Sequence, residues 1–132
     1  MKIIICGSMS CAREMIEFKK KLENLGHVVK IPEDAEKHLN GKITEQDKWE
    51  KLEFNVFKNY FQEIKKSDAI LIINKEKNKL INYIGGNTLI EMAFAHVLDK
   101  KIFLLNPIPL LSYTNEIEAM NPIILNGDLN NI

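Results

Sequence analysis

The sequence predicts an α/β fold in which helices cover both faces of a parallel sheet. Short apolar runs without polar alternation recur along the chain, as is typical of strands buried on both sides. Segments of helical periodicity alternate with these runs, which favours a parallel sheet. The chain has 132 residues, of which 45% are hydrophobic and 27% are charged. We expect a single domain over residues 1–132, large enough to form its own core.

The first part of the chain predicts a strand, a helix and a second strand. Residues 3–6 are an unbroken apolar run. Residues 11–25 carry apolar side chains at helical spacing, and Gly26 ends this helix. Residues 27–31 predict the second strand, so the segment is a β-α-β unit.

A polar loop is expected over residues 32–41, and a long helix over residues 44–66. The helix has two apolar stripes: Trp49, Leu52, Val56, Tyr60 and Ile64 in one, and Phe54, Phe57 and Phe61 in the other. Two stripes indicate burial on two sides, against the sheet and against a partner subunit.

Three further strands are predicted over residues 68–74, 102–105 and 123–125. A mostly apolar helix precedes the second of them and ends near residue 99, and a short helix over residues 115–120 precedes the third. The fold class is therefore a doubly wound, Rossmann- or flavodoxin-like sheet of five parallel strands. Ligands bind such sheets beyond the carboxyl ends of the strands, where the strand order reverses.

One turn at that edge follows the first strand and consists of Gly7, Ser8, Met9 and Ser10. Arg13, the only arginine, lies one helical turn further on. Backbone amides, hydroxyl groups and a guanidinium group suit a phosphate. The alternative is a turn of small residues in which Ser10 caps the helix. Neither a dinucleotide-binding fingerprint nor a P-loop is present.

The second turn at that edge reads Gly85, Gly86, Asn87 and Thr88, and Glu91 follows. Asn87 or Thr88 is expected to cap the helix, and its free N–H groups favour an anion. Glu91 is a candidate for chemistry. The alternative is a capping box, in which Thr88 is the cap and Glu91 only satisfies a backbone N–H.

Three more polar residues lie at strand ends and are candidates for substrate binding. Asp68 opens the third strand, although capping of the turn after the long helix is favoured for it, because Asp commonly serves in turns. Asn126 and Asp128 follow the last strand.

The remaining reactive residue types predict neither a metal nor a cofactor. His38 and His96 lack partners at metal-binding spacing. Cys6 and Cys11 are too few for a disulfide scaffold and are expected to be reduced packing residues. The serines have no evident His–Asp pair, so a serine hydrolase is not expected.

Composition limits the partners. The formal net charge is zero, so there is no electrostatic reason to expect binding to nucleic acid or to an anionic membrane. No apolar run is long enough to span a bilayer, and no N-terminal signal is evident. The sequence predicts a cytoplasmic protein that acts on a small molecule. The lysine-rich residues 75–79 are expected to be a solvated surface turn.

Three segments in order resemble the nucleoside 2-deoxyribosyltransferase superfamily, including its 2′-deoxynucleoside 5′-phosphate N-hydrolase branch. They are Ile-Cys-Gly-Ser at residues 5–8, Ser-Asp-Ala-Ile-Leu-Ile-Ile at residues 67–73, and Gly-Gly-Asn-Thr-x-x-Glu-Met-Ala-x-Ala at residues 85–95. The likeness spans nearly the whole chain. It implies that Glu91 is the nucleophile that attacks C1′ of the sugar, with Ala93 in place of the usual glycine. It also implies that residues 7–10 lie against the substrate, and that a neighbouring subunit completes the site in a homodimer or larger homo-oligomer.

One residue of that family pattern is missing. The family usually supplies an Asp from the helix before the third strand, and residues 55–61 contain none. Tyr60, Asp68 and Asp128 are candidates for the second role. Glycines 85 and 86 with Glu91 also resemble, less closely, the turn of the "lonely guy" cytokinin-activating phosphoribohydrolases.

The expected function is cleavage or transfer at the N-glycosidic bond of a (deoxy)nucleoside or its 5′-monophosphate, without a cofactor. The phosphate-suited first turn favours a phosphorylated substrate. One alternative is a catalytically inactive nucleotide-binding or sensor module of the same fold. The other is a structural oligomer in which Glu91 is only a cap.

Overall fold

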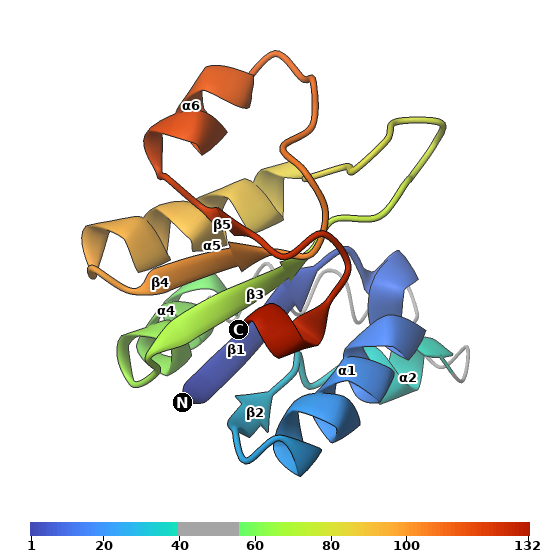
Figure 1. The fold of residues 1–132 in the computed structure, drawn as a ribbon, viewed down its shortest axis with the longest axis vertical. Coiled ribbons are helices and arrows are strands. Elements are labelled where there is room, and N and C mark those ends of the chain that lie inside the picture. Colours follow the sequence, from blue (N-terminus) through green and yellow to red (C-terminus); the bar gives the residue numbers. More distant parts are fainter. Residues whose placement is uncertain (40–55) are drawn as a thin grey trace.

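The computed structural model describes residues 1–39 and 56–132 and contains one parallel sheet (Figure 1). The strands are β1 (Lys2–Gly7), β2 (Val28–Lys30), β3 (Ala69–Ile73), β4 (Lys101–Leu104) and β5 (Ile123–Ile124). Their order is β2-β1-β3-β4-β5, and every neighbouring pair is parallel. The predicted fold class and all five predicted strands are confirmed, within one or two residues at each end.

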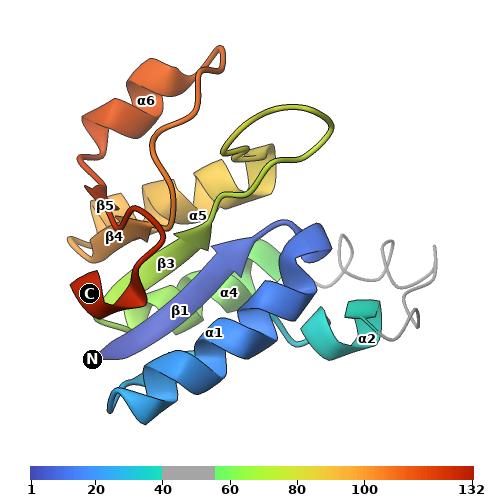
Figure 2. The ribbon, with the colours of Figure 1, turned by 45° about the vertical axis from the view of Figure 1, so that its right-hand side comes forward.

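The helices lie on both faces of the sheet. They are α1 (Ala12–Asn24), α2 (Ala35–Leu39), α4 (Val56–Lys65), α5 (Gly86–Val97) and α6 (Thr114–Ala119), with short 3-10 helices η1 (Met9–Cys11) and η2 (Leu129–Asn131). Figure 2 shows α1 in front of the sheet and α4 behind it. The helix α2 packs against α1, and none of the helices in the described ranges is long and apolar enough to cross a membrane.

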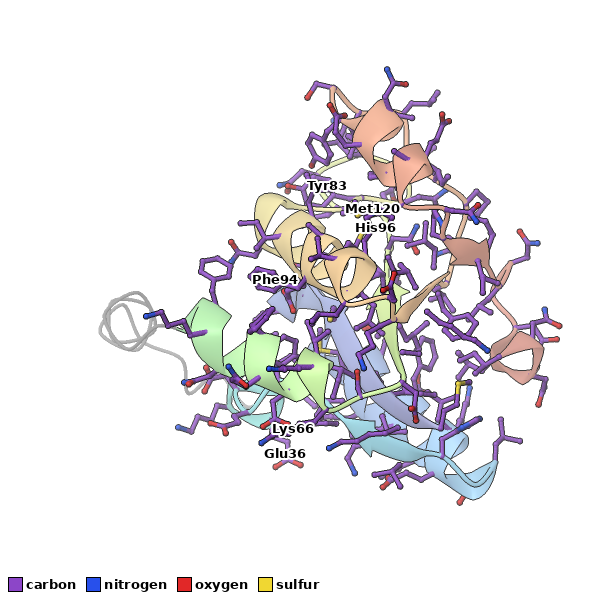
Figure 3. All side chains as sticks on the ribbon, turned by 90° about the vertical axis from the view of Figure 1, so that its left-hand side faces the viewer. Glu36, Lys66, Tyr83, Phe94, His96 and Met120 are labelled. Atoms are coloured by element: carbon purple, nitrogen blue, oxygen red, sulfur yellow. The ribbon has the colours of Figure 1, made fainter. Side chains whose placement is uncertain are left out.

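Alternate residues of each strand point to opposite faces, so the core has two halves. Ile3, Ile5, Leu71 and Phe103 face α1 and η2. Ile4, Cys6, Ile70, Ile72 and Leu104 face α4, α5 and α6. On that second face, Phe61 of α4 meets Phe94 of α5 edge to face, with ring centroids 5.2 Å apart (Figure 3).

Two predictions about the chain between β2 and β3 need comment. Residues 32–41 were expected to form a loop, and α2 shows that part of this prediction to be wrong. Of the predicted long helix, the structure describes α4, while Trp49, Leu52 and Phe54 lie outside the described residues. Within α4, Ile64 is fully buried and Tyr60 packs against the same half of the core, as its stripe predicted.

The register brings the ends of the two central strands together. Gly7, the last residue of β1, pairs with Ile73, the last residue of β3. A Cβ atom on Gly7 would lie 3.2 Å from the Ile73 carbonyl oxygen, so a glycine permits this close approach. The turn after β1 and the loop after β3 therefore emerge side by side at the carboxyl edge.

Candidate active site

Glu91 lies in the second turn of α5 and is not a capping residue. The N-cap of α5 is Gly85, no side chain caps the helix, and its first turn contains no acidic residue. The Leu89 N–H closes that turn by donating to the Gly85 carbonyl at 2.9 Å. Thr88 lies inside the helix and is buried. The expected cap at Asn87 or Thr88 and the capping-box alternative for Glu91 are therefore wrong.

The Glu91 carboxyl group is half-buried against the end of β1. Burial raises the pKa of Glu91 from its ordinary value of 4.5 to about 7, and a hydrogen bond from the Cys6 thiol acts in the opposite direction. No cationic side chain of the described residues is among the groups that shift this pKa. A carboxyl group without a counter-ion, at the ligand-binding edge of a doubly wound sheet, is a candidate for chemistry.

Cys6 is fully buried beside Glu91. Burial, and then the nearby Glu91 carboxylate, raises the pKa of the Cys6 thiol well above its ordinary value. The thiol therefore remains protonated near neutral pH and acts as a hydrogen-bond donor. The expectation that Cys6 is only a packing residue overlooked this contact.

Tyr60 reaches the same place from α4. Its hydroxyl group donates to the Ile5 carbonyl oxygen at 2.5 Å and also contacts the Cys6 thiol. Burial raises the pKa of Tyr60 well above its ordinary value, so the phenol stays protonated. Of the three candidates for the second role, Tyr60 is the one that the structure places on the Glu91 side of the sheet.

The turn after β1 collects hydroxyl groups and a lysine. Ser8 caps η1, accepting from the Ser10 N–H at 3.3 Å and from the Ser10 hydroxyl at 3.0 Å. The N-cap of α1 itself is Cys11, without a side-chain cap, so the alternative in which Ser10 caps this helix is wrong. The Lys77 ammonium donates to the Ser8 hydroxyl oxygen at 2.9 Å and lies 5.8 Å from the centre of the Tyr83 ring. The loop expected to be a solvated turn therefore lies over the first turn.

Lys75 binds the first turn of α1, which follows this segment. Its ammonium lies 2.5 Å from Glu14 Oε1. Burial acts to raise the pKa of Glu14, but Lys75, together with weaker contributions that include Arg13, outweighs it, so this pKa lies below its ordinary value. Arg13 is exposed on α1, and Met9 packs into the α1 half of the core.

The structure does not bring the other candidates to Glu91. Asp68 lies at the amino end of β3, where it accepts from the Lys2 N–H at 2.8 Å. It therefore lies at the opposite edge of the sheet, where its side chain joins the start of β3 to the start of β1. Asp128 caps η2 by accepting from the Asn130 N–H at 2.9 Å, and η2 packs on the α1 face. Asn126 immediately precedes this segment. Gly86 and Asn87, by contrast, are exposed at the start of α5.

Sequence reasoning also missed a polar pair at the carboxyl edge. Asn74 is fully buried directly after β3, and its side-chain oxygen accepts from the Asn106 N–H at 2.9 Å. In return, the Asn106 amide group donates to the Asn74 carbonyl oxygen at 2.9 Å. These bonds join the ends of β3 and β4. The signal in the sequence was an amide side chain just after each of two apolar strands.

Elsewhere in the described residues, the structure offers fewer groups suited to catalysis. A groove of about 340 Å³ lies between α1 and the β2–α2 segment, lined by Ile16, Lys19, Lys20, Glu23, Ile31, Pro32, Glu33 and Glu36. It is on the far side of the molecule from Glu91. No group of three His, Cys, Asp or Glu side chains in the described ranges is placed to hold a metal ion.

The fold has a counterpart among solved structures. A comparison with solved structures finds the CMP N-glycosidase BcmB of Clostridium botulinum, with a TM-score of 0.56 and 18% sequence identity. The match covers 96% of this chain and 90% of that chain. At this identity the likeness establishes the fold, and it confirms the resemblance that the sequence predicted at that level. No protein-family model and no curated protein sequence gives a match.

Proposed function

We propose that this protein cleaves the N-glycosidic bond of a nucleoside or nucleotide, by hydrolysis or by transfer to another base. The observation that carries the proposal is Glu91: a half-buried carboxyl group with no counter-ion in the part of the chain that the structure describes, at the carboxyl edge of a fold shared with a CMP N-glycosidase. In this proposal Glu91 is the nucleophile.

The chemistry suits such a group. Cleavage of the bond between sugar and base develops positive charge at C1′, which a carboxylate stabilises or traps. Glu91 attacks C1′, the bonding electrons leave with the base, and the base takes a proton from solvent. Water or a second base then attacks C1′, and the carboxylate leaves unchanged. With a pKa of about 7, roughly half of Glu91 is ionised at neutral pH.

The first turn supports a phosphorylated substrate. Cys6 contacts Glu91, and Ser8, two residues further along the chain, holds Lys77. Two residues span at most about 7 Å between Cα atoms. This spacing suits a 5′-monophosphate whose phosphate binds Ser8, Ser10 and Lys77 while C1′ faces Glu91. Lys77 takes the role that the sequence suggested for Arg13.

The primary experiment incubates the protein with deoxynucleosides, ribonucleosides and their 5′-monophosphates and measures free base by chromatography. We expect base release that Glu91→Gln slows on the order of a thousandfold or more. Glu118→Gln, an exposed glutamate on α6, is the matched control and should retain full activity. Equal activity of Glu91→Gln and the wild type would exclude Glu91 as the nucleophile.

The phosphate contact has a separate test. Lys77→Gln should lower kcat/KM for a 5′-monophosphate about tenfold or more, because a hydrogen bond to a charged group is lost. It should leave the unphosphorylated nucleoside unaffected. Lys79→Gln, an exposed lysine in the same loop, is the control. If Arg13→Ala produces this selective loss and Lys77→Gln does not, the assignment reverts to Arg13.

A second candidate function is a nucleotide-binding module without catalysis. The positions of the three candidates for the second role favour it. The Tyr60 hydroxyl donates its proton to the Ile5 carbonyl oxygen, and Asp68 and Asp128 lie away from Glu91. If CMP or another monophosphate shifts the melting temperature and is recovered intact after long incubation, this alternative is correct and the enzymatic proposal fails.

We also propose a homodimer or larger homo-oligomer. Ile90 and Val97, on α5, have exposed fractions of 41% and 77%, although the helix that carries them is largely apolar. Sedimentation of the wild type and of Val97→Glu tests this, since a charge in the interface should shift the protein towards monomer.

A further inference from the structure

We propose that Tyr83 is a positioning residue for Lys77: its ring holds the lysine ammonium over the Ser8 hydroxyl group, where the phosphate of a 5′-monophosphate would bind. This role rests on the phosphate contact of the proposed function, and it makes Tyr83 a residue that selects for phosphorylated substrates. Tyr83 acts through Lys77 and not on the sugar or the base. Inorganic phosphate is therefore a sufficient probe, and the role can be measured without turnover.

Lys77 is a half-buried cation that has no carboxylate partner among the described residues. Its ammonium donates to the Ser8 hydroxyl oxygen at 2.9 Å and lies 5.8 Å from the centre of the Tyr83 ring. Lys75, two residues earlier, is instead paired with Glu14 at 2.5 Å. Because the neighbours of Lys77 are a neutral oxygen and an aromatic ring, its charge stays available for an anion.

The loop between β3 and α5 extends beyond the carboxyl ends of the strands (Figure 2), and its backbone folds Tyr83 back towards Lys77. Lys77 and Leu80 exchange two backbone hydrogen bonds, of 3.1 and 2.9 Å, across a tight turn. The Tyr83 N–H then donates to the Lys75 carbonyl oxygen at 3.1 Å. The two arms of the loop are thus joined, which keeps the ring and the lysine side by side.

The Tyr83 ring lies on Gly85, the N-cap of α5. A Cβ atom on Gly85 would lie 3.3 Å from both Cε1 and the hydroxyl oxygen of Tyr83. Gly85 has φ −83° and ψ 175°, a conformation open to any residue, so the close approach of the ring, rather than the turn itself, favours a glycine here. The Tyr113 hydroxyl donates to the carbonyl oxygen of Ile84, the residue between them. The ring is therefore held in place independently of Lys77.

A fixed ring should strengthen phosphate binding in two ways. At a partly exposed site, an aromatic ring stabilises a nearby ammonium by about two- to fivefold in an equilibrium constant. It also restricts a long lysine side chain that would otherwise have to be ordered when the phosphate binds. Loss of the ring should weaken binding of the phosphate group and leave the unphosphorylated part of a substrate unaffected.

The experiment measures the dissociation constant of inorganic phosphate for the full chain, at constant ionic strength, from the backbone amide NMR shifts of Ser8 and Ser10. The variants are Tyr83→Phe, which keeps the ring, Tyr83→Leu, which removes it, and the matched control Phe18→Leu. Lys21, in the last turn of α1, lies 5.6 Å from the centre of the Phe18 ring. The control therefore removes the same kind of contact away from the carboxyl edge.

We expect Tyr83→Leu to raise the dissociation constant of phosphate about two- to fivefold. Tyr83→Phe and Phe18→Leu should keep the wild-type value. In the Lys77→Gln background, Tyr83→Leu should have no further effect, because the ring acts only through the lysine. In a protein that releases base, Tyr83→Leu should lower the ratio of kcat/KM for a 5′-monophosphate to kcat/KM for its nucleoside by the same factor, through KM and not through kcat.

Equal dissociation constants in Tyr83→Leu and the wild type would overturn this role of Tyr83, as would an equal loss with and without Lys77. A wild type that binds no phosphate would overturn it too, although base release from unphosphorylated nucleosides would still support the enzymatic proposal. If Tyr83→Leu does not fold, as judged by circular dichroism, Tyr83→Met takes its place in the same comparison. The expected loss of phosphate affinity in a protein that releases no base would support the role of Tyr83 while the enzymatic proposal fails.

Discussion

The two sides of the carboxyl edge each pair a buried thiol with a glutamate, and the two glutamates titrate in opposite directions. On the α5 side, Cys6 contacts Glu91, and burial raises the pKa of Glu91 to about 7. On the α1 side, Glu14 is near Cys11, and its pKa lies below the ordinary value although burial acts to raise it. The largest difference between the two neighbourhoods, within the described residues, is one charge.

That charge is Lys75, whose ammonium lies 2.5 Å from Glu14. It cancels the cost of burying Glu14 and fixes that carboxylate as ionised, so Glu14 fastens the loop after β3 to α1. Among the described residues, Glu91 has no such partner. A buried carboxylate that has no counter-ion lowers the stability of the folded state. Carboxyl groups of this kind are found most often at functional sites. The comparison therefore distinguishes Glu14, a carboxylate with a structural role, from Glu91, a candidate for catalysis.

The largest expected effect on stability is that of Glu91→Gln. The folded-state pKa of Glu91 is raised from 4.5 to about 7, so the folded state binds the proton more tightly than the unfolded state. The contribution of Glu91 to stability is therefore most favourable below pH 4.5 and is lost as the pH rises to 7. Glutamine avoids this cost and should raise the free energy of unfolding at pH 8 by up to about 3 kcal/mol, with little effect at pH 4.5.

Urea unfolding at the two pH values measures this gain. A plain cap predicts the reverse, a loss of roughly 0.5–2 kcal/mol. Glu14→Gln is the paired control: it should destabilise the protein slightly at pH 8, because Lys75 loses its partner. If both variants change stability in the same direction, the contrast between the two carboxyl groups is wrong.

The second expected effect is on the rate. The nucleophile must be ionised, so kcat/KM for base release should rise with pH and level off above about 7, the pKa of Glu91. Between pH 7 and pH 5 the rate should fall about fiftyfold, because the ionised fraction of Glu91 drops from about one half to about one hundredth. The control variant Glu14→Gln should show the same decrease of kcat/KM at acid pH as the wild type. A profile that is flat from pH 5 to 8 would contradict a catalytic carboxylate with this pKa.

The smallest expected effect is that of Lys75→Gln. The ion pair is partly exposed, with 46% of the Lys75 side chain accessible, so its loss should cost no more than about 1 kcal/mol. The pKa of Glu14 should rise towards that of a buried, unpaired carboxyl group, and the pKa of Glu91 should not change. Carboxyl ¹³C NMR measures the pKa of each glutamate separately. An equal shift of both would show that Lys75 acts on the whole edge.

Most elements of the fold followed from pattern alone, for identifiable reasons. Strands such as β1 and β3 are continuous apolar runs because a parallel sheet buries both faces. The turn with Gly85 and Gly86 marked the start of α5. The short helix α2 was missed, because five residues of mixed polarity carry little periodicity.

The site was predictable only in part. Glu91 and Ser8 were found because each follows a glycine turn after a strand. Asp68 was grouped with them in error, since sequence position does not distinguish the two ends of a strand. Lys77 and Cys6 were missed. A lysine-rich loop and a cysteine in an apolar run give the same sequence pattern whether they lie at a site or elsewhere in the fold.

The sequence by itself determined the layers of this protein: which segments are strands, that they run parallel, and that two turns lie at the ligand-binding edge. These follow from periodicity and turn chemistry, which are local. The tertiary structure alone decided the electrostatics, because a pKa depends on what lies across the sheet. It placed Lys75 beside Glu14 and, within residues 1–39 and 56–132, no cation beside Glu91. It thereby made one of two similar glutamates a permanent anion and the other a group that titrates near neutral pH.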